Sequence, residues 1–535
     1  MQLISTNMKN TFPIQNFGFL ILFSVFNTSS YSQDILWEKS FGGKQAEYLL
    51  DAIPTADYGF ILAGSSLSDK SGNKTESRKG NYDYCLWKIS EKGEIDWQKS
   101  FGGSKNDMLM SVQNTNDGGY ILAGTSNSPL DFDKTDATIG QQDLWILKLD
   151  AAGKLLWQKT IGGLADEQLA CIKVTSDGGY IIGASSASDK YEAKKSETNK
   201  NTIYKDTDSR GNLDYWVIKL DKKGTLEWQK TMGGNYLDQL RSIVQTTDGN
   251  YLVGGVSNSD MGFEKNQKSE GENDFWFMKL DKKGNIIWQQ TYGGGGDDQL
   301  YTVLQTTDKN FIVAGNTNSA STPKGSSPEG SDFMLLKMDE SGALLWEKLY
   351  TNGTDDVLTN LVKNKDETLL LCGYSRGTSK KKTEGTDAYE VIKIDKDGEE
   401  LWRKSVDKKG KNVLNKALET RDGGYVLAGT NSDSTAADFW VVKLKDLKKP
   451  DVIKSTIEAL PNPASTYTNI IVGFDFTKGT ASVYDIAGRQ LQSFAITSRT
   501  VPIDLSSLPE GIYIVNIDTD KGRGGIKVIK QEIKK

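Results

Sequence analysis

The stretch Asp274–Gly294, DFWFMKLDKKGNIIWQQTYGG, decides the fold, because the chain contains seven versions of it. It reads as two strands joined by a tight turn: a nearly continuous apolar run, a glycine where the chain reverses, and a second strand ending at paired glycines. The tryptophan of the second strand recurs at intervals of 60, 60, 71, 60, 58 and 56 residues, as Trp37, Trp97, Trp157, Trp228, Trp288, Trp346 and Trp402. Such a period indicates a repeat architecture.

Each repeat contains two more strand signals ahead of this pair, such as YTVLQT (301–306) and NFIVAG (310–315). A hairpin of the TDGG type joins these two strands in most repeats. The third strand is apolar on both faces, as in DLWILKLD (143–150), and must therefore be covered on both sides. Four short antiparallel strands repeated seven times predict an all-β fold, a seven-bladed β-propeller.

The two ends of the array indicate how the ring closes. The chain enters at ILWEKSFGG (35–43), which is a fourth strand without the first three, and the array ends with a third strand that has no fourth. We therefore expect the segment around Trp37 to complete the last blade. Closure in this way removes the open sheet edges that an unclosed array would have.

The sequence outside the array predicts three further regions. Residues 1–32 read as a secretory signal peptide, because a ten-residue apolar run follows a small positive region. That run is too short to cross a bilayer, and no transmembrane segment is expected. The propeller is assigned to residues 33–445, a charged linker to 446–456, and a C-terminal β-sandwich, which the resemblance below makes a sorting domain, to 457–535.

Composition narrows the function classes. The 65 basic and 71 acidic residues give no field for nucleic acid, so we expect no nucleic-acid partner. The chain has no histidine, which excludes imidazole bases and Ser-His-Asp triads, and we expect a protein that is not an enzyme. Cys85, Cys171 and Cys372 lie in apolar strand-like runs and read as buried, unreactive thiols.

Six repeats have an acidic residue at one equivalent position, four residues after the second glycine where the glycine pair is present: Glu47, Asp107, Glu167, Asp238, Asp298 and Asp356, with Asn412 in the seventh. This acidic rim would lie on one face of the ring. We consider a Ca²⁺ site formed by Asp107, Asp238, Asp298 and Asp356, which would be the only cofactor. The alternative is that each carboxylate caps its own turn. The aspartates that open the third strands (Asp83, Asp143, Asp214, Asp274, Asp332, Asp387, Asp438) are read as structural. The glycine pairs are read as turns, because no helix follows them.

The connections between second and third strands, called the rim loops, are the better candidates for binding, since recognition residues concentrate on loops held by a scaffold. They are Ser65–Tyr82, Thr125–Gln142, Ser185–Leu213, Val256–Asn273 and Asn316–Ser331, with shorter versions in the last two repeats. We expect them to vary in length. They are polar, so they could also be solvated spacers. Aromatic side chains that could stack on a sugar are Phe132, Tyr191, Tyr204 and Phe263.

The repeats resemble the bacterial SBBP-type β-propeller repeats, in which a D-x-F/W-V-x-K-L-D strand, D-x-x-G, a tryptophan strand, GG and D-G-x-Y-x-x-G follow in this order. These motifs are scaffold motifs, and the resemblance implies the propeller and no activity.

The C-terminal region resembles the type A sorting domain of the type IX secretion system of Bacteroidetes. LPNPAS (460–465), VYDIAGRQL (483–491), LSSLPEGIYIV (505–515) and IKVIK (526–530) match the motifs of that family in order. The matching residues are Pro461, Asn462, Pro463, Asp485, Gly488, Arg489, Gly511, Tyr513 and Lys527. The resemblance implies the type IX machinery as a partner, a secreted, extracellular or outer-surface location, and in some members attachment to surface lipopolysaccharide. An ordinary adhesive sandwich domain is the alternative.

We therefore expect a secreted or surface-displayed binding protein whose ligand is an unidentified glycan or protein. One alternative is a polysaccharide-acting enzyme that uses paired carboxylates. Another is a purely structural envelope protein. The acids occur mainly at repeated positions, whereas catalysis needs a unique constellation, and this difference favours binding.

Overall fold

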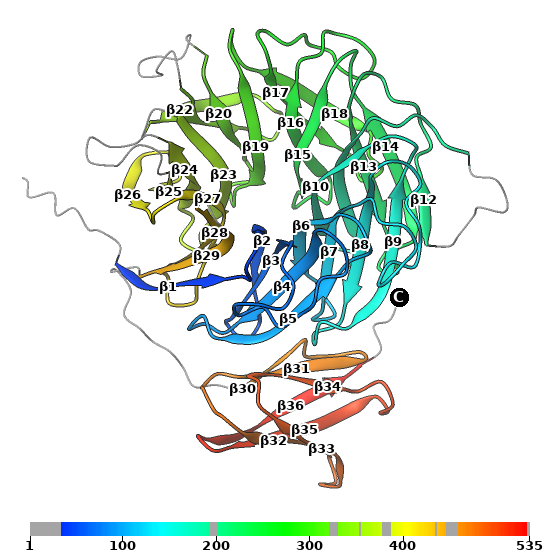
Figure 1. Cartoon of the computed structure of the whole chain (residues 1–535), viewed down its shortest axis with the longest axis vertical. Coiled ribbons are helices and arrows are strands. Elements are labelled where there is room, and N and C mark those ends of the chain that lie inside the picture. Colours follow the sequence, from blue (N-terminus) through cyan, green and yellow to red (C-terminus); the bar gives the residue numbers. More distant parts are fainter. Residues whose placement is uncertain are drawn as a thin grey trace, which may run out of the picture. The chain divides into compact units, whose positions relative to one another are not determined.

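The computed structural model describes residues 34–192, 201–319, 330–351, 355–376, 387–433, 436–445 and 457–531. The predicted signal peptide (1–32) and linker (446–456) lie outside the described residues. All regular elements of the described part are strands (Figure 1).

Seven sheets of four antiparallel strands make up residues 35–444, as the repeat pattern predicts, and one of them gains a short fifth strand. The first strands of the seven blades are β2 (Glu47–Pro54), β6 (Asp107–Asn114), β10 (Glu167–Val174), β15 (Asp238–Gln245), β19 (Asp298–Gln305), β23 (Asp355–Lys363) and β27 (Lys411–Glu419). The second strands are β3 (Phe60–Ser66), β7 (Tyr120–Ser126), β11 (Tyr180–Ser186), β16 (Tyr251–Ser257), β20 (Phe311–Thr317), β24 (Leu369–Arg376) and β28 (Tyr425–Ser432).

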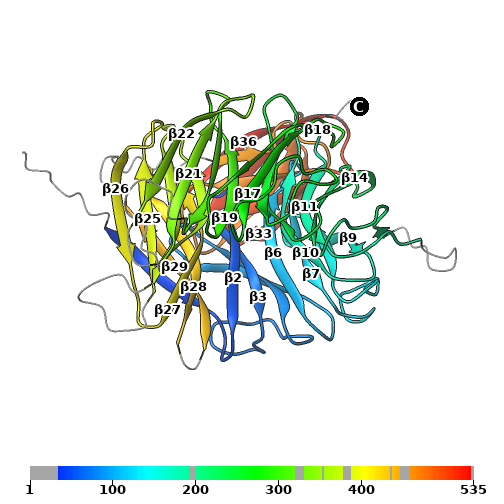
Figure 2. The same cartoon turned by 90° about the horizontal axis from the view of Figure 1, so that it is seen from above.

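The third strands are β4 (Asp83–Ile89), β8 (Asp143–Leu149), β13 (Asp214–Leu220), β17 (Asp274–Leu280), β21 (Asp332–Met338), β25 (Ala388–Ile394) and β29 (Ala437–Leu444). The fourth strands are β5 (Ile95–Phe101), β9 (Leu155–Gly162), β14 (Leu226–Met232), β18 (Ile286–Tyr292), β22 (Leu344–Tyr350), β26 (Glu400–Val406) and, from the start of the chain, β1 (Ile35–Phe41). Figure 2 shows these blades in an orthogonal view.

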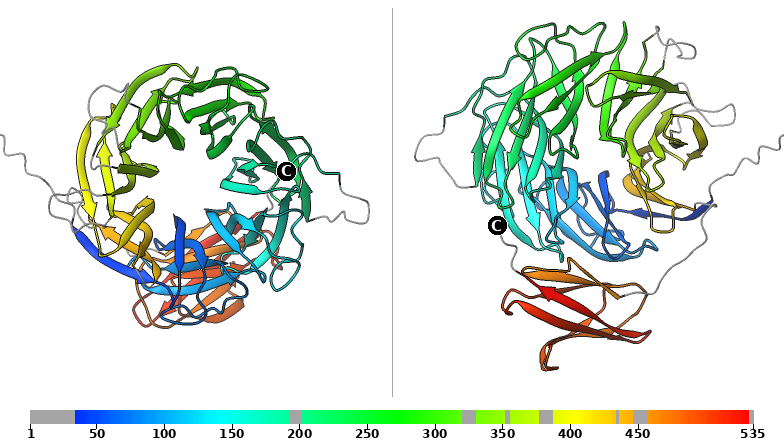
Figure 3. Two further views of the ribbon diagram at one scale, coloured as in Figure 1. Left: turned by 45° about the horizontal axis from the view of Figure 1, so that its top comes forward. Right: turned by 180° about the vertical axis from the view of Figure 1, so that it is seen from behind.

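The seven blades form a closed ring. Each first strand contacts the first strand of the next blade, and β27 of blade 7 contacts β2 of blade 1. The first strands surround the centre of the ring (Figure 3). Closure comes from β1, which pairs antiparallel with β29, with Trp37 opposite Lys443 and Phe41 opposite Phe439. The prediction that the N-terminal strand completes the last blade is confirmed.

The apolar core lies between the blades. Seven hydrophobic clusters each join two neighbouring blades, including the cluster of Phe41, Leu49 and Phe439 between blades 7 and 1. Every residue of β4, β8, β13, β17, β21 and β25 is buried, as expected for strands covered on both faces. Cys85 and Cys372 are buried, whereas Cys171, which was expected to be buried too, is half-buried.

The twelve tryptophans divide into two groups. The five in third strands are fully buried, but the seven in fourth strands are only half-buried. Five of the latter (Trp37, Trp97, Trp157, Trp228 and Trp288) pack on the glycine of the third-to-fourth strand turn of the next blade. At Gly284, where φ is +81°, an added β-carbon would lie 2.7 Å from the Trp228 ring. Glycine is thus required there by the left-handed backbone and by the close ring, which explains why the tryptophan and the D-x-x-G turn recur together.

The C-terminal region folds as two sheets, as predicted. One contains β30 (Ile457–Leu460), β31 (Tyr467–Val472) and β34 (Thr500–Asp504); the other contains β33 (Gln490–Ile496), β32 (Gly479–Asp485), β35 (Gly511–Thr519) and β36 (Arg523–Lys530). A core of Ile470, Val472, Val483, Val515 and Val528 with their neighbours joins the two sheets.

Candidate functional site

The acidic rim is buried and engaged in the hydrogen bonds of its own turns. The second glycine of the glycine pair donates its backbone N–H to the acid at 2.7–3.2 Å: Gly43 to Glu47, Gly103 to Asp107, Gly163 to Glu167, Gly234 to Asp238 and Gly294 to Asp298. Serine hydroxyls also donate to these carboxylates, as Ser128 does to Asp107 (2.9 Å). A hydroxyl of Ser375 donates to Asp356, and in blade 7 the Asn412 amide donates to Asp387 O (2.7 Å). This geometry is the one expected of turn-capping residues.

Each rim acid also lies close to the aspartate at the start of the third strand of the preceding blade. An added β-carbon on Gly162 would lie 2.0 Å from Asp143 Oδ1 and 2.8 Å from Glu167 Oε2. Burial, with the charge of Glu167 adding to it, raises the pKa of Asp143 to about 8. Burial and the neighbouring rim acid likewise raise the pKa of Asp83, Asp214 and Asp274 to about 6. The Asp143–Glu167 pair therefore holds one proton at neutral pH.

The residues considered for calcium are not gathered into one site. Asp107, Asp238, Asp298 and Asp356 belong to four different blades. Within the described ranges, no group of three or more acidic, histidine or cysteine side chains is placed to hold a metal ion. The acidic rim therefore offers repeated carboxyl pairs, and calcium binding stays a prediction that a chelator can test.

Four rim loops share a buried lysine that was not predicted from the sequence. Lys74, Lys134, Lys205 and Lys265 are buried, and each lies nine residues before the aspartate that opens the third strand. Lys205 Nζ, for example, donates to the carbonyls of Ser188 and Thr207, both at 2.7 Å. The constant spacing is the signal that could have revealed them. These loops are thus built around a buried cation. The loops of blades 1, 2 and 4 have equal length, and the expected variation comes from the longer loop of blade 3 and the shorter loop of blade 5.

The rim loop of blade 3 differs from that plan. In blade 1, 16 residues separate Ser66 from Asp83, but 27 separate Ser186 from Asp214. The longer loop contributes β12 (Thr202–Tyr204), which pairs parallel with β9 of blade 2.

Beside β12, Tyr191 and Tyr204 lie with ring centroids 5.4 Å apart. They line a pocket of about 750 Å³ together with Lys159, Lys190 and Asp206. The structure therefore brings together two of the four aromatic residues singled out from the sequence.

The other two aromatic residues stand apart in equivalent loops. Phe132 and Phe263 are 68% and 65% exposed and have positive φ angles of 45° and 51°. The Arg210 guanidinium lies 5.7 Å from the centre of the Phe263 ring. Each phenylalanine occupies a position that is Gly72 in blade 1, eleven residues before the third-strand aspartate, so the loop geometry sets these backbone angles.

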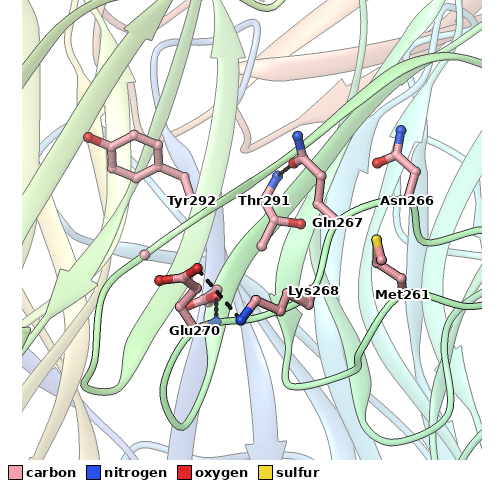
Figure 4. A pocket seen from close by; sticks show the side chains of 9 residues that line it. Met261, Asn266, Gln267, Lys268, Glu270, Thr291 and Tyr292 are labelled. Carbon is pink, nitrogen blue, oxygen red and sulfur yellow. Dashed lines mark hydrogen bonds and ion pairs between the residues drawn. The ribbon is translucent and has the colours of Figure 1, made fainter.

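A second pocket, of about 490 Å³, lies at blade 4 (Figure 4). Its wall includes Tyr292, Lys268 and Glu270, and the Gln267 side chain accepts a 2.7 Å hydrogen bond from the Thr291 backbone N–H. Thr291 to Gly293 correspond to Thr160 to Gly162 of blade 2, the residues that pair with β12. In blade 2 this edge of β9 is covered by β12. In blade 4 the equivalent edge of β18 lines the pocket instead.

The sorting motif residues serve the fold of the C-terminal region. Asn462 lies between Pro461 and Pro463; its side chain donates to Lys527 O (2.7 Å) and accepts from Ile529 N–H (2.8 Å), which joins the first motif to β36. The Lys530 ammonium, which the sequence reasoning did not single out, donates to Leu505 O (2.6 Å).

The remaining motif residues form turns of the same region. Asp485 accepts from the backbone N–H and the Nε of Arg489 in the turn that contains Gly488, and the Tyr513 hydroxyl donates to Pro509 O (2.6 Å). Gly511 begins β35.

Comparison with known proteins gives one family match. Residues 458–531 match the secretion system C-terminal sorting domain. The chain is also 24% identical over 284 residues to the regulatory protein FlaEY of Caulobacter vibrioides, covering 49% of this chain and 29% of that protein. The chain therefore spans less than a third of this relative's length.

Solved structures similar to the chain include two at low identity. The Pan2 WD40 domain of Neurospora crassa is 11% identical, with a TM-score of 0.31, over 64% of this chain and 90% of that chain. A variant of the Synechocystis apocarotenoid oxygenase is 12% identical, with a TM-score of 0.38, over 78% and 95%.

In the described ranges, no helix is long and apolar enough to cross a membrane. The family match indicates the location of the protein. A sorting domain at residues 458–531 implies export by the type IX secretion system, to the cell surface or beyond.

Proposed function

We propose that the protein is a non-catalytic binding protein that holds a glycan in the pocket of the blade 3 rim loop. The observation that carries the proposal is the pair formed by Tyr191 and Tyr204. Aromatic faces provide the apolar area on which sugar rings stack, and a few convergent polar groups fix the orientation of a ligand. Here Lys190 and Asp206 supply such groups next to the two rings.

Two further features support binding over catalysis. The sorting domain delivers the chain to a place where glycans of the cell surface and its surroundings are accessible. The carboxyl pairs that could serve a glycosidase recur between blades and are buried, as Asp143 and Glu167 are. An active site on this ring would need carboxylates that reach a substrate, and the absence of histidine removes the commonest alternative base.

A glycan array probed with the chain from residue 34 onward tests the proposal. We expect binding that falls at least tenfold in Tyr204→Ala and Tyr191→Ala. Phe132→Ala, an equally aromatic change on the blade 2 loop, is the matched control and should keep full binding. A wild-type chain that binds no glycan but captures a surface protein would replace the glycan by a protein ligand. Equal losses in all three variants would locate binding outside the blade 3 pocket.

A further inference from the structure

The centre of the propeller carries a positive charge that its own carboxylates do not neutralise. Each first strand has a bulge at the same place, and the bulge residues are half-buried: Leu50, Met110, Ala170, Arg241, Tyr301, Thr359 and Asn415. Six of the seven are uncharged. The innermost strands therefore present a single arginine at this level of the ring.

The residues that follow the bulges are used for a different purpose. Asp51 accepts from the backbone N–H of Val112 (2.9 Å), and Ser242 accepts from that of Val303 (3.2 Å) in the next blade. These side chains tie neighbouring blades together. The bulge residue of blade 4, Arg241, makes no such hydrogen bond to the next blade, and its Nε is buried without a partner.

Arg241 differs in its partners from four other arginines of the ring. Arg210, Arg376, Arg403 and Arg421 each form an ion pair with a carboxylate, respectively Glu264, Asp355, Glu400 and Glu91. In the described part of the chain the Arg241 side chain has no ion pair and no hydrogen bond, and its Nε is buried without an acceptor. Its guanidinium lies 5.6 Å from the centre of the Tyr301 ring.

A second cation stands on the neighbouring first strand. Lys173 of β10 is half-buried and likewise has no ion pair among the described residues. The carboxylate whose charge acts on Lys173 is Asp51, but Asp51 already binds Lys416, with Nζ and Oδ1 3.3 Å apart. Burial lowers the pKa of Lys173 and of Arg241.

We propose that the centre of the propeller binds a small oxyanion, a carboxylate, sulfate or phosphate group, on the guanidinium of Arg241. Removing a cation from water without a counterion is costly. An anion from solution would supply that counterion and would accept hydrogen bonds from the unused N–H donors. The planar fork of arginine fits two oxygens of one oxyanion. This site is independent of the proposed glycan pocket, which lies on the rim loop of blade 3.

The test measures the melting temperature of the chain from residue 34 onward at constant ionic strength, with chloride replaced by phosphate, sulfate or glucuronate. A ligand that binds only the folded state raises the melting temperature in a saturable way. We expect such a rise in the wild type, its loss in Arg241→Gln, and its retention in Arg403→Gln, whose arginine pairs with Glu400 on β26. Response to glucuronate alone assigns the site to a sugar carboxylate, and response to phosphate or sulfate alone assigns it to an inorganic or esterified anion.

A chloride-only measurement separates binding from a structural role. We expect Arg241→Gln to melt at the wild-type temperature or above it, because the variant removes an unpaired charge. Arg241→Lys should keep a weakened anion response, since the charge stays and the fork is lost. A lower melting temperature for Arg241→Gln in chloride, together with equal anion responses in wild type and variant, would overturn the proposal.

Discussion

The seam between blades 7 and 1 is held differently from the seam between blades 1 and 2. At the latter, the chain runs directly from β5 into β6, and the Tyr84 hydroxyl donates to Trp145 O (2.9 Å). At the closing seam, Phe439 stands where Tyr84 does, so this bond is lost. Arg421 instead binds Glu91 with two hydrogen bonds (2.8 and 2.6 Å), and Lys416 binds Asp51.

The difference teaches how a ring compensates for a missing covalent connection. A neutral hydrogen bond contributes about 1 kcal/mol, whereas a charge-assisted, two-pronged pair is roughly twice as strong. The closing seam combines such pairs with the full register of β1 on β29 and with a shared apolar cluster. Blades that the chain joins in sequence also have ion pairs across their seams, such as Lys79 with Asp133 (2.6 Å), but at the seam of blades 1 and 2 the covalent connection and the neutral Tyr84 hydrogen bond add to the ion pair.

Removing the closing strand should have the largest effect. Deletion of Ile35–Phe41 exposes the edge of β29 and the cluster around Phe439, and we expect it to lower the free energy of unfolding by more than about 5 kcal/mol. Thermal unfolding followed by circular dichroism measures the loss. The control is Leu36→Ala, because Leu36 is 50% exposed. Unchanged melting of the deletion would mean that closure does not stabilise the ring.

Removing one polar contact at each seam should lower the free energy of unfolding by different amounts at the two seams. Arg421→Ala leaves Glu91, which is 15% exposed, without its partner, and should cost about 2–3 kcal/mol. Tyr84→Phe gives the first seam the residue that the closing seam already has, and should cost about 1 kcal/mol. Chemical denaturation gives both numbers. Equal costs would remove the distinction between the seams.

The carboxyl pairs make the seams sensitive to pH. A raised pKa means that the folded chain holds the proton more tightly than the unfolded chain, so the stabilisation is complete below about pH 4. It is lost as pH rises through about 6 for Asp83, Asp214 and Asp274, and through about 8 for Asp143.

Asp143→Asn should remove a dependence of about 1 kcal/mol per pH unit at the seam of blades 2 and 3. Melting curves between pH 4 and 9 should show that the melting temperature of the variant, relative to that of the wild type, rises as the pH increases. The seam of blades 6 and 7, where Asn412 replaces the rim acid, offers a comparison in which Asp387→Asn should change the profile less. Parallel profiles for the Asp143→Asn variant and the wild type would contradict the shared proton.

The smallest effect is expected from a chelator. The rim carboxylates already accept backbone and hydroxyl hydrogen bonds, so EDTA should move the melting temperature by less than about 1 °C. A decrease that added Ca²⁺ reverses would instead support calcium binding at Asp107, Asp238, Asp298 and Asp356.

The sequence predicted the blades, their number and the closing strand, because period-2 alternation and the recurring tryptophan report on local strands and on their order. Five of the rim acids accept a hydrogen bond from a glycine four residues earlier, as the turn-cap interpretation of the sequence predicts. Features that depend on which strands meet in space were out of reach. The pairing of Asp143 with Glu167 crosses a seam, and β12 pairs with a strand of another blade.

Arg241 illustrates the same limit at the candidate site. In the sequence it is one of several scattered arginines, and nothing there distinguishes it from Arg210 or Arg403. Its lack of a partner follows from how the strands are assembled: Asp51 of β2, a carboxylate on another first strand, binds Lys416 instead. Such a negative property belongs to the assembled ring and not to any local pattern.

The pairing of Ile35 with Leu444 has a consequence for the order of folding. The strand that completes the ring leaves the ribosome first, while its partner β29 leaves last of the twenty-nine strands that precede the C-terminal region. Bringing two such distant segments together is slow, because the entropy of closing so long a loop must be met before the contacts form. Until that moment blade 7 has an open edge, so it should be the last blade to gain protection against proteases, whether the chain folds at the ribosome or after a membrane passage.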